Sequence, residues 1–168
     1  INMITPSDTQ QAFKIVSDHG FAQVLLNNSI GQQALHASTH FSPGDVICDF
    51  HAGSTLPYPT YLTVQVADDK HITLQPEFLQ YINHSCDPNV FFDTTTMQLV
   101  CLKAMEPGDE FTFFYPSTEW EMAQPFNCHC GSPDCLEVIG GAAQIPVAIL
   151  DRYKLTDFIR GKVERVSE

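Results

Sequence analysis

The protein has 168 residues, of which 43% are hydrophobic and 17% are charged. This length and composition suit one globular domain with short appendages and exclude a disordered chain. No run of 18 apolar residues occurs, which excludes a transmembrane helix of ordinary length. Residues 1–10 lack the basic and apolar regions of a signal peptide, so we expect an intracellular, cytoplasmic or nuclear protein.

The acidic residues are unevenly distributed. The formal net charge is −12, and residues 1–141 contain three lysines, no arginine and sixteen acidic residues, a formal charge of −13. An acidic body binds phosphate poorly, so we expect no direct nucleic-acid partner and no membrane contact. The same charge attracts a cationic ligand or a basic peptide. Solubility is the plainer reading, and charge by itself favours it.

Short apolar runs separated by turn residues predict a mainly β fold, a sandwich or a barrel-like arrangement of strands. Two alternating pairs of runs predict hairpins, with turns at residues 67–70 and 93–96. Ser42–Asp45 and Glu106–Asp109 are turns by composition. In chain order, the expected elements are a short helix over 9–18, strands over 21–26, 46–50, 62–66, 71–74, 89–92, 98–102 and 110–115, and helices over 147–153 and around 158–159. Pro146 suits the first turn of the former helix, and Thr156 is a candidate N-cap for the latter.

Three cysteines near residue 130 have metal-ligand spacing. Cys128, Cys130 and Cys135 form a C-x-C-x4-C pattern whose tight Gly/Pro turn lets thiolates converge. Zinc takes four ligands in a tetrahedron, so one ligand is missing from this pattern. The candidates are Cys86, His129, Cys101 and Cys48, of which Cys86 is favoured because it lies in a polar loop. A four-cysteine site is structural, since it leaves no position for a catalytic water. A disulfide or free thiols are the alternative.

Two further segments are notable. Residues 83–89 form a dense polar loop between apolar runs, and residues 110–115 form an alternating segment that ends at Tyr115. Their sequences are Asn83-His84-Ser85-Cys86-Asp87-Pro88-Asn89 and Glu110-Phe111-Thr112-Phe113-Phe114-Tyr115. Taken alone, the first is typical of a turn and the second of a core strand.

Together with the cysteine spacing, these segments resemble the SET domain family of protein lysine methyltransferases and its post-SET zinc knuckle. The loop matches the family motif Asn-His-Ser-Cys-x-Pro-Asn at every fixed position. The second segment fits Glu-Leu-Thr-Phe-Asp-Tyr except at Phe111 and Phe114. The three motifs also occur in the family's order, and the resemblance covers roughly residues 21–141.

The resemblance implies a fold of small curved sheets with a knot-like threaded segment after residue 83, a short zinc knuckle and short C-terminal helices. It implies four divisions: an N-terminal appendage over 1–20, a SET domain over 21–123, a post-SET knuckle over 124–141 and a C-terminal helical appendage over 142–168. It also implies one structural zinc ion, for which Cys86 is the fourth ligand beside Cys128, Cys130 and Cys135.

The implied activity is methyl transfer from S-adenosylmethionine to the ε-amine of a lysine in a basic protein or peptide, such as a histone tail. A small-molecule tailoring enzyme and an inactive interaction module are the alternatives. Tyr115 is the implied catalytic residue, and Phe113 holds the position that sets product multiplicity, where Phe allows di- or trimethylation. The implied cofactor-binding residues are Gly31, Gln33, Tyr81, Asn83 and His84. The oligomeric state stays open.

Three further features depart from the family pattern. The family's Gly-x-Gly loop aligns with residues 31–37, where Gln32 and Ala34 replace both glycines and Gly31 lies one position away. Many relatives carry an Arg three residues before the motif Asn, and this chain has Gln80. The first strand of the family ends in a Tyr that lines the substrate channel, and here that position is Phe50.

Overall fold

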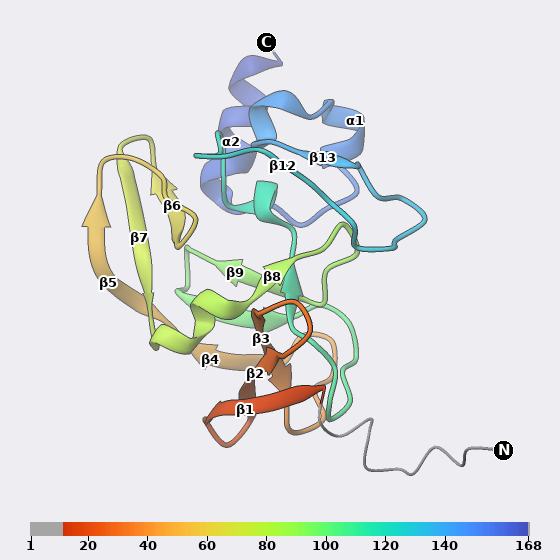
Figure 1. Cartoon of the computed structure of the whole chain (residues 1–168). Helices are drawn as coiled ribbons and strands as arrows, with labels where there is room; N and C mark the ends of the chain where they lie inside the picture. The colour runs from red at the N-terminus through yellow and green to blue at the C-terminus, as the bar shows by residue number, and fades with distance from the viewer. Residues whose placement is uncertain (1–11, 168) are drawn as a thin grey trace, which may run out of the picture.

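The computed structural model describes residues 12–167 and shows a mainly β protein. Small sheets make up most of the described chain, and the α-helices lie together at the C-terminal end (Figure 1). The predicted class, small sheets with short C-terminal helices, is confirmed. No helix among residues 12–167 combines the length and apolar character needed to cross a membrane.

The first sheet is an antiparallel set of three strands, β1 (Phe13–Asp18), β2 (Ala22–Asn27) and β3 (Gln32–Ala37). The predicted helix over 9–18 is therefore wrong for residues 13–18, and residues 9–11 lie outside the described part. Ile15 and Val16 are β-branched and favour a strand, and β2 supplies the hydrogen-bonding partner. Gly31 closes the turn into β3 with a φ of 70°, which suits glycine.

Both predicted hairpins are confirmed. The first consists of β6 (Thr63–Ala67) and β7 (Lys70–Gln75), which pair with β5 (His51–Leu56) in the order β5-β7-β6. The second consists of β9 (Val90–Asp93) and β10 (Gln98–Cys101), which pair with β4 (Val46–Asp49) in the order β4-β10-β9. The β5-β7-β6 sheet projects to one side of the molecule (Figure 1).

A short parallel pair brings the two motif segments side by side. Strand β8 (Asn83–His84) pairs with β11 (Thr112–Phe113), with His84 opposite Phe113. The Asn89 side chain holds this arrangement, because it donates to the Glu110 carbonyl and accepts from the Thr112 N–H, both at 2.8 Å. The expected strand over 110–115 is thus shorter, since helix η2 (Tyr115–Ser117) begins at the tyrosine. A second 3₁₀ helix, η1 (Glu77–Tyr81), precedes β8.

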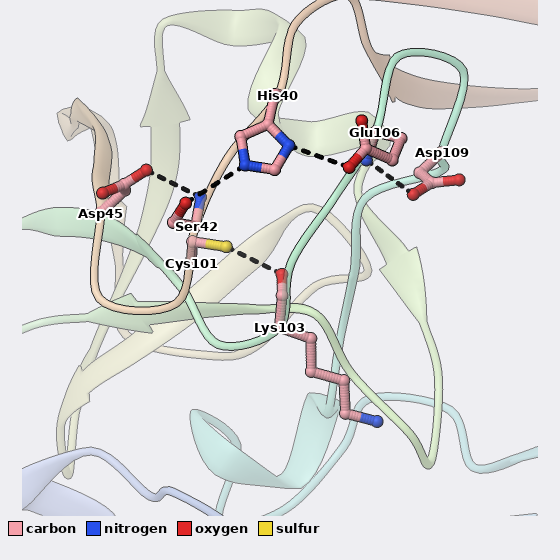
Figure 2. A network of polar contacts seen from close by, with 7 residues as sticks. All are labelled: His40, Ser42, Asp45, Cys101, Lys103, Glu106 and Asp109. Atoms are coloured by element: carbon pink, nitrogen blue, oxygen red, sulfur yellow. Dashed lines mark hydrogen bonds and ion pairs between the residues drawn. The ribbon is translucent and has the colours of Figure 1, made fainter.

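The two predicted turns are joined by polar contacts (Figure 2). His40 lies between them, with Nδ1 3.0 Å from a Glu106 carboxylate oxygen and Nε2 3.2 Å from the Ser42 hydroxyl. Asp45 caps its turn by accepting from the Ser42 N–H, and Asp109 does the same for the Glu106 N–H. This network fixes the start of the segment that leads to Tyr115.

The C-terminal part contains β12 (Phe126–Asn127), β13 (Val138–Ile139), η3 (Ala142–Gln144), α1 (Val147–Leu150) and α2 (Asp157–Val166). Pro146 precedes α1 as expected, but this helix ends at Leu150 and not at residue 153. The predicted cap is confirmed, because the Thr156 side chain accepts from the Ile159 N–H at 3.2 Å. Lys162 on α2 pairs with Asp68 in the β6–β7 turn and thereby connects the two regions.

Within residues 12–167, buried apolar side chains form one large cluster and two smaller ones. The large cluster lies between the strands and includes Leu35, Phe92, Leu99 and Phe111, each fully buried. A second cluster lies under the C-terminal helices. The third surrounds Cys86, Cys128 and Ile139, where β12 and β13 approach the 83–89 loop.

Candidate active site and cysteine cluster

Tyr115 lines two cavities of different chemical character. The apolar cavity, of about 740 Å³, is bordered by Pro59, Thr60, Tyr61, Leu62, Thr63, Val64, Leu74, Leu79, Gln80, Ile82, Phe113, Tyr115, Glu119, Met122, Ala123, Gln124, Pro125 and Phe126. The polar cavity, of about 610 Å³, is bordered by Gln32, Asn83, His84, Glu110, Tyr115, Phe126, Asn127, Cys128, His129 and Cys130. The side chains of Tyr115 and Phe126 are common to both linings.

Aromatic rings surround Tyr115. Its ring centroid lies 4.6 Å from Phe113, 5.1 Å from His84 and 5.8 Å from Phe126. Burial among these rings raises the pKa of Tyr115 to about 12. The phenol is therefore neutral at physiological pH and carries a hydroxyl proton.

His84 connects Tyr115 to the cysteines. Its Nδ1 accepts a hydrogen bond from the Tyr115 backbone N–H at 3.1 Å, which places the ring proton on Nε2. That nitrogen lies 3.4 Å from the Cys86 Sγ. Burial lowers the pKa of His84 to about 4, so the imidazole is neutral. The histidine thus orients the tyrosine backbone and faces a thiol without adding a charge.

Asn83 and Glu110 give the polar cavity its hydrogen-bonding groups. The Asn83 side chain donates to the Gln33 carbonyl at 3.2 Å and so ties β8 to β3. Burial raises the pKa of the Glu110 carboxyl. The side-chain oxygen of Gln33 is buried without a partner in the described structure. These groups, with the aromatic ring of Phe126, provide polar and stacking contacts for a ligand that is itself part polar and part aromatic.

The predicted cofactor residues do not all reach a cavity. Asn83 and His84 line the polar cavity, and Gln33 lies next to it through its carbonyl. Neither Gly31 nor Tyr81 lines either cavity, since Gly31 closes a turn and Tyr81 packs against the large core. Gln80 faces the apolar cavity. Phe50 also packs into the core, 5.4 Å from the Phe92 ring.

Several lining residues were not predicted. Gln32, Glu110 and Phe126 line the polar cavity, and Glu119 lines the apolar one. In the sequence, Gln32 stands only where the family has a glycine, and Phe126 lies two residues before the first knuckle cysteine. Glu119 lies in none of the motifs, and the sequence does not distinguish it from a surface charge in a chain with twenty acidic residues.

The four predicted cysteines lie together. The Sγ atoms of Cys86, Cys128, Cys130 and Cys135 are all within 4.8 Å of one another, and all four thiols are free. Thiolates around a tetrahedral zinc lie roughly 3.8 Å apart, because each Zn–S bond is about 2.3 Å long. The Cys86 and Cys128 sulfurs are 4.0 Å apart. The set therefore fits a zinc ion, and the structure makes Cys86 the fourth cysteine, not Cys48 or Cys101.

Hydrogen-bond donors surround the cysteine sulfurs. The Leu136 N–H donates to the Cys86 Sγ and the Glu137 N–H to the Cys135 Sγ, both at 3.4 Å. Burial raises the pKa of the Cys128 thiol to about 11, and a divalent cation would reverse this by stabilising the thiolate. Such outer contacts fix the orientation of metal ligands.

The C-terminal helices reach this region through Tyr153. Its hydroxyl donates to the Cys86 carbonyl at 2.7 Å, and its ring stacks on Phe114 with centroids 3.7 Å apart. Phe114 is one of the two departures from the second family motif, and it is 1% exposed. The aromatic residue at this position therefore stacks on a partner from the C-terminal part of the chain.

Comparison with known proteins identifies the family. The SET domain model matches residues 32–116, which is half of the chain. The chain belongs to the SET domain family. The matched region contains both motif segments and ends one residue after Tyr115, so it includes this residue of both cavity linings.

The relatives are named as methyltransferases. Methyltransferase flvH of Aspergillus flavus is 43% identical over 106 residues, which cover 62% of this chain and 59% of that protein. An H3 lysine-36 specific histone-lysine N-methyltransferase of Candida albicans is 35% identical over 77 residues, or 42% of this chain and 9% of that protein. One from Saccharomyces cerevisiae is 26% identical over 103 residues, or 58% of this chain and 14% of that protein. The chain thus spans less than two thirds of each of these relatives.

Proposed function

We propose that this protein transfers a methyl group from S-adenosylmethionine to the ε-amine of a lysine in a basic protein or peptide. The observation that carries the proposal is the position of Tyr115, which lies on the wall of a polar cavity and of an apolar cavity at once. Methyl transfer requires a donor and an acceptor to meet at one point, and the tyrosine marks such a point. The names of the relatives support the same class of reaction.

The polar cavity is the proposed cofactor site. Asn83, His84 and Glu110 supply hydrogen-bonding groups there, and Phe126 supplies an aromatic face. Bound S-adenosylmethionine brings a methyl group that its sulfonium has already activated. The remaining tasks of the protein are to align the acceptor, to exclude water and to favour the neutral amine.

The apolar cavity is the proposed acceptor site. A free lysine has a pKa of about 10.4 and arrives charged, and an apolar, aromatic surround favours its neutral form. Phe113 and Phe126 form such a surround beside Tyr115. The neutral Tyr115 hydroxyl is able to hold the amine nitrogen in line for transfer. Phe113, instead of a second tyrosine, leaves room for a methylated amine, so we expect di- or trimethylation.

Charge supports a basic substrate. The −13 charge of residues 1–141 attracts a positively charged peptide and raises its encounter rate. A histone tail has this chemistry, and histone-lysine methyltransferases are among the relatives. We therefore expect a cytoplasmic or nuclear location. We also propose that the four cysteines bind one structural zinc ion and form a post-SET knuckle.

A small-molecule amine is the second candidate for the acceptor. The observation that favours it is the size of the apolar cavity, since about 740 Å³ lies within the roughly 300–1,000 Å³ typical of small-molecule sites. A single lysine side chain needs less room. A tailoring enzyme for small amines would use the same polar cavity and the same tyrosine.

Calorimetry with S-adenosylmethionine tests the proposal first. We expect saturable binding to the zinc-containing protein. An absence of heat and of any thermal shift at millimolar cofactor would instead favour an inactive interaction module. Incubation with a panel of lysine peptides and small amines then separates the two candidate substrates, because only the accepted class gains 14 mass units per transfer, about the mass of one CH₂.

Tyr115→Phe tests the catalytic assignment. We expect methyl transfer to fall by about 10²–10³-fold, as for the loss of one positioned hydroxyl in an active site, with cofactor affinity unchanged. Tyr58→Phe is a matched control, because Tyr58 is 58% exposed and lines neither cavity. Equal rates for the two variants would remove Tyr115 from the mechanism.

A further inference from the structure

A buried carboxylate forms part of the apolar cavity wall. Glu119 follows η2 and is 6% exposed, yet it belongs to the cavity lining. Burial raises its pKa to about 7. A carboxyl group in an apolar site is expensive to ionise without a partner, so its presence in this wall needs an explanation.

The protein holds Glu119 through one of its two oxygens. Oε2 accepts from the Gln65 N–H at 3.1 Å and from the Thr118 hydroxyl at 2.6 Å. Among residues 12–167, no hydrogen-bond or ion-pair partner is found for Oε1. The carboxylate is therefore oriented, while half of its accepting capacity stays available.

The backbone around Glu119 is fixed as well. The Glu119 carbonyl accepts from the Ala142 N–H at 2.9 Å, and the Trp120 carbonyl accepts from the Ala143 N–H at 3.0 Å. Gly141 makes this approach possible, because a Cβ there would collide with the Trp120 backbone. A carboxylate held in this way behaves as a preformed site and not as a mobile surface charge.

The other lining groups supply no counter-charge. Within the described lining of the apolar cavity, Glu119 is the only Asp, Glu, Lys, Arg or His, and Tyr115 stays neutral because its pKa is about 12. Lys162, on the nearby helix α2, is paired with Asp68. A positive charge beside Glu119 would therefore come from a molecule that enters the cavity.

We propose that Glu119 is a specificity-determining residue that binds the positively charged amine of the acceptor through Oε1. The inference rests on the proposed function and adds a requirement to it. The acceptor enters the cavity as a cation held by Glu119 and releases its proton to solvent before the neutral nitrogen takes the methyl group, and a neutral molecule of the same shape is rejected. Charge-assisted hydrogen bonds contribute about 1.5–3 kcal/mol, so the preference amounts to roughly 10–100-fold in affinity.

The test compares a cation with a neutral molecule of similar shape. n-Pentylammonium and 1-pentanol are titrated by NMR into the full zinc-containing chain, with and without S-adenosylhomocysteine, which has no methyl group to transfer. We expect the wild type to bind the ammonium at least about 10-fold more tightly. Glu119→Gln, which keeps the shape and an acceptor for the Gln65 N–H, should reduce this ratio to within about 2-fold.

Glu121→Gln is the matched control. It removes the same charge two residues away, from an exposed side chain that does not line the cavity. We expect it to keep the wild-type preference. Two results would overturn the inference: no preference for the ammonium in the wild type, or a preference that persists in Glu119→Gln.

A second measurement covers the case in which Glu119→Gln does not fold. If an ammonium binds the carboxylate, the wild type at pH 7 should release up to about half a proton per amine bound, because a group with a pKa near 7 is half protonated there. Calorimetry in two buffers of different ionisation enthalpy measures this release. No release would contradict the inference. Failure of the cofactor to bind would instead refute the proposed function, and the amine titration without cofactor would still test Glu119.

Discussion

Around Phe92 the molecule consists of fully buried aromatic and aliphatic side chains from the strands, whereas around Cys128 buried apolar residues are few and four thiols take their place. The first region is able to hold its shape by apolar burial alone. The second contains the two-residue strands β12 and β13, which are too short to be stable without further support. Tyr115 lies between the two regions, so the site needs both.

The difference suggests separate roles. The strand core fixes Asn83, Phe113 and the segment up to Tyr115, and the cysteine region supplies Phe126 and the far wall of the polar cavity. Loss of the proposed zinc should therefore abolish binding of the proposed cofactor, S-adenosylmethionine, while most of the sheets survive. Loss of core packing should unfold everything.

Removal of zinc is the change with the largest expected effect. Structural zinc in small domains contributes about 10–16 kcal/mol of binding free energy, which is folding free energy for the residues that depend on it. We expect chelation, or Cys128→Ser, to eliminate hydrogen-exchange protection of residues 126–139 and the binding of S-adenosylmethionine, while β6, β7, β9 and β10 stay protected. Metal analysis and hydrogen exchange measure both effects.

Cys48→Ser is the control for the metal experiment, because Cys48 lies on β4 outside the cluster. This variant should retain about one zinc per chain. A metal-free wild type with a protected 126–139 segment would show that the four cysteines are only neighbours.

Phe92→Ala tests the other half of the comparison. Phe92 is fully buried and its ring lies edge-on to Phe50 and Phe113. Truncation should lower the free energy of unfolding by about 3–5 kcal/mol and shift the urea midpoint for the whole chain. Phe13→Ala is the matched control, since Phe13 is 48% exposed on β1. This variant should lower the free energy of unfolding by less than about 1 kcal/mol. Equal costs would mean that the strand core is not the stabilising region.

The sequence predicts the elements whose signals are local. The β6–β7 and β9–β10 hairpins have alternating runs on both sides of a polar turn, and the motif loops identify Asn83, His84, Cys86 and Tyr115 by letter. The short pattern of residues 13–18 fits a helix or a strand, and pairing with the partner strand β2 makes it a strand. Strand β5 was not predicted at all. Its first five residues are exposed, and pairing with β7 is what defines it.

The residues of the candidate site also divide into those with a local sequence signal and those placed by tertiary contacts. The motifs identify Asn83, His84 and Tyr115, whereas Glu119 and Phe126 reach the cavities through tertiary structure. Glu110 and Gln32 lie in motif-aligned segments, but the motifs do not indicate that they line a cavity. Glu119 shows the limit most clearly, because nothing in its neighbours distinguishes it from the exposed Glu121 two positions later. Tertiary contacts make the difference, because the Glu119 side chain accepts from the Gln65 N–H of β6 and lies in the cavity wall, whereas Glu121 is exposed.

Tyr153 tests whether the C-terminal helices support the cysteine region. Tyr153→Phe removes the hydrogen bond to the Cys86 carbonyl and keeps the stack on Phe114, so it should lower the free energy of unfolding by about 0.5–1.5 kcal/mol. Tyr153→Ala removes both contacts, and loss of the stack should lower the free energy of unfolding by about 0.5–1.5 kcal/mol more. Urea denaturation gives the stabilities, and zinc retention under a competing chelator gives the local effect. If chelator resistance is unchanged in both variants, the helices and the cysteines are independent.

Loss of the Thr156 cap has the smallest expected effect and tests the contribution of helix α2 by itself. Its side chain accepts from the Ile159 N–H, and its backbone N–H donates to the Ser117 carbonyl at 3.0 Å, so the helix start is fixed to the segment just after Tyr115. Thr156→Ala keeps the backbone contact and loses the cap, so it should lower the free energy of unfolding by about 1 kcal/mol. Thr156→Ser should lower it much less, because a serine hydroxyl also caps a helix. Ile159 and Val163 of α2 are buried in the second cluster. We therefore expect Thr156→Ala to lower the urea midpoint without any change in zinc content. A loss of zinc from Thr156→Ala would mean that the cap supports the cysteine region as well, and the two regions would then be less separate than their packing indicates.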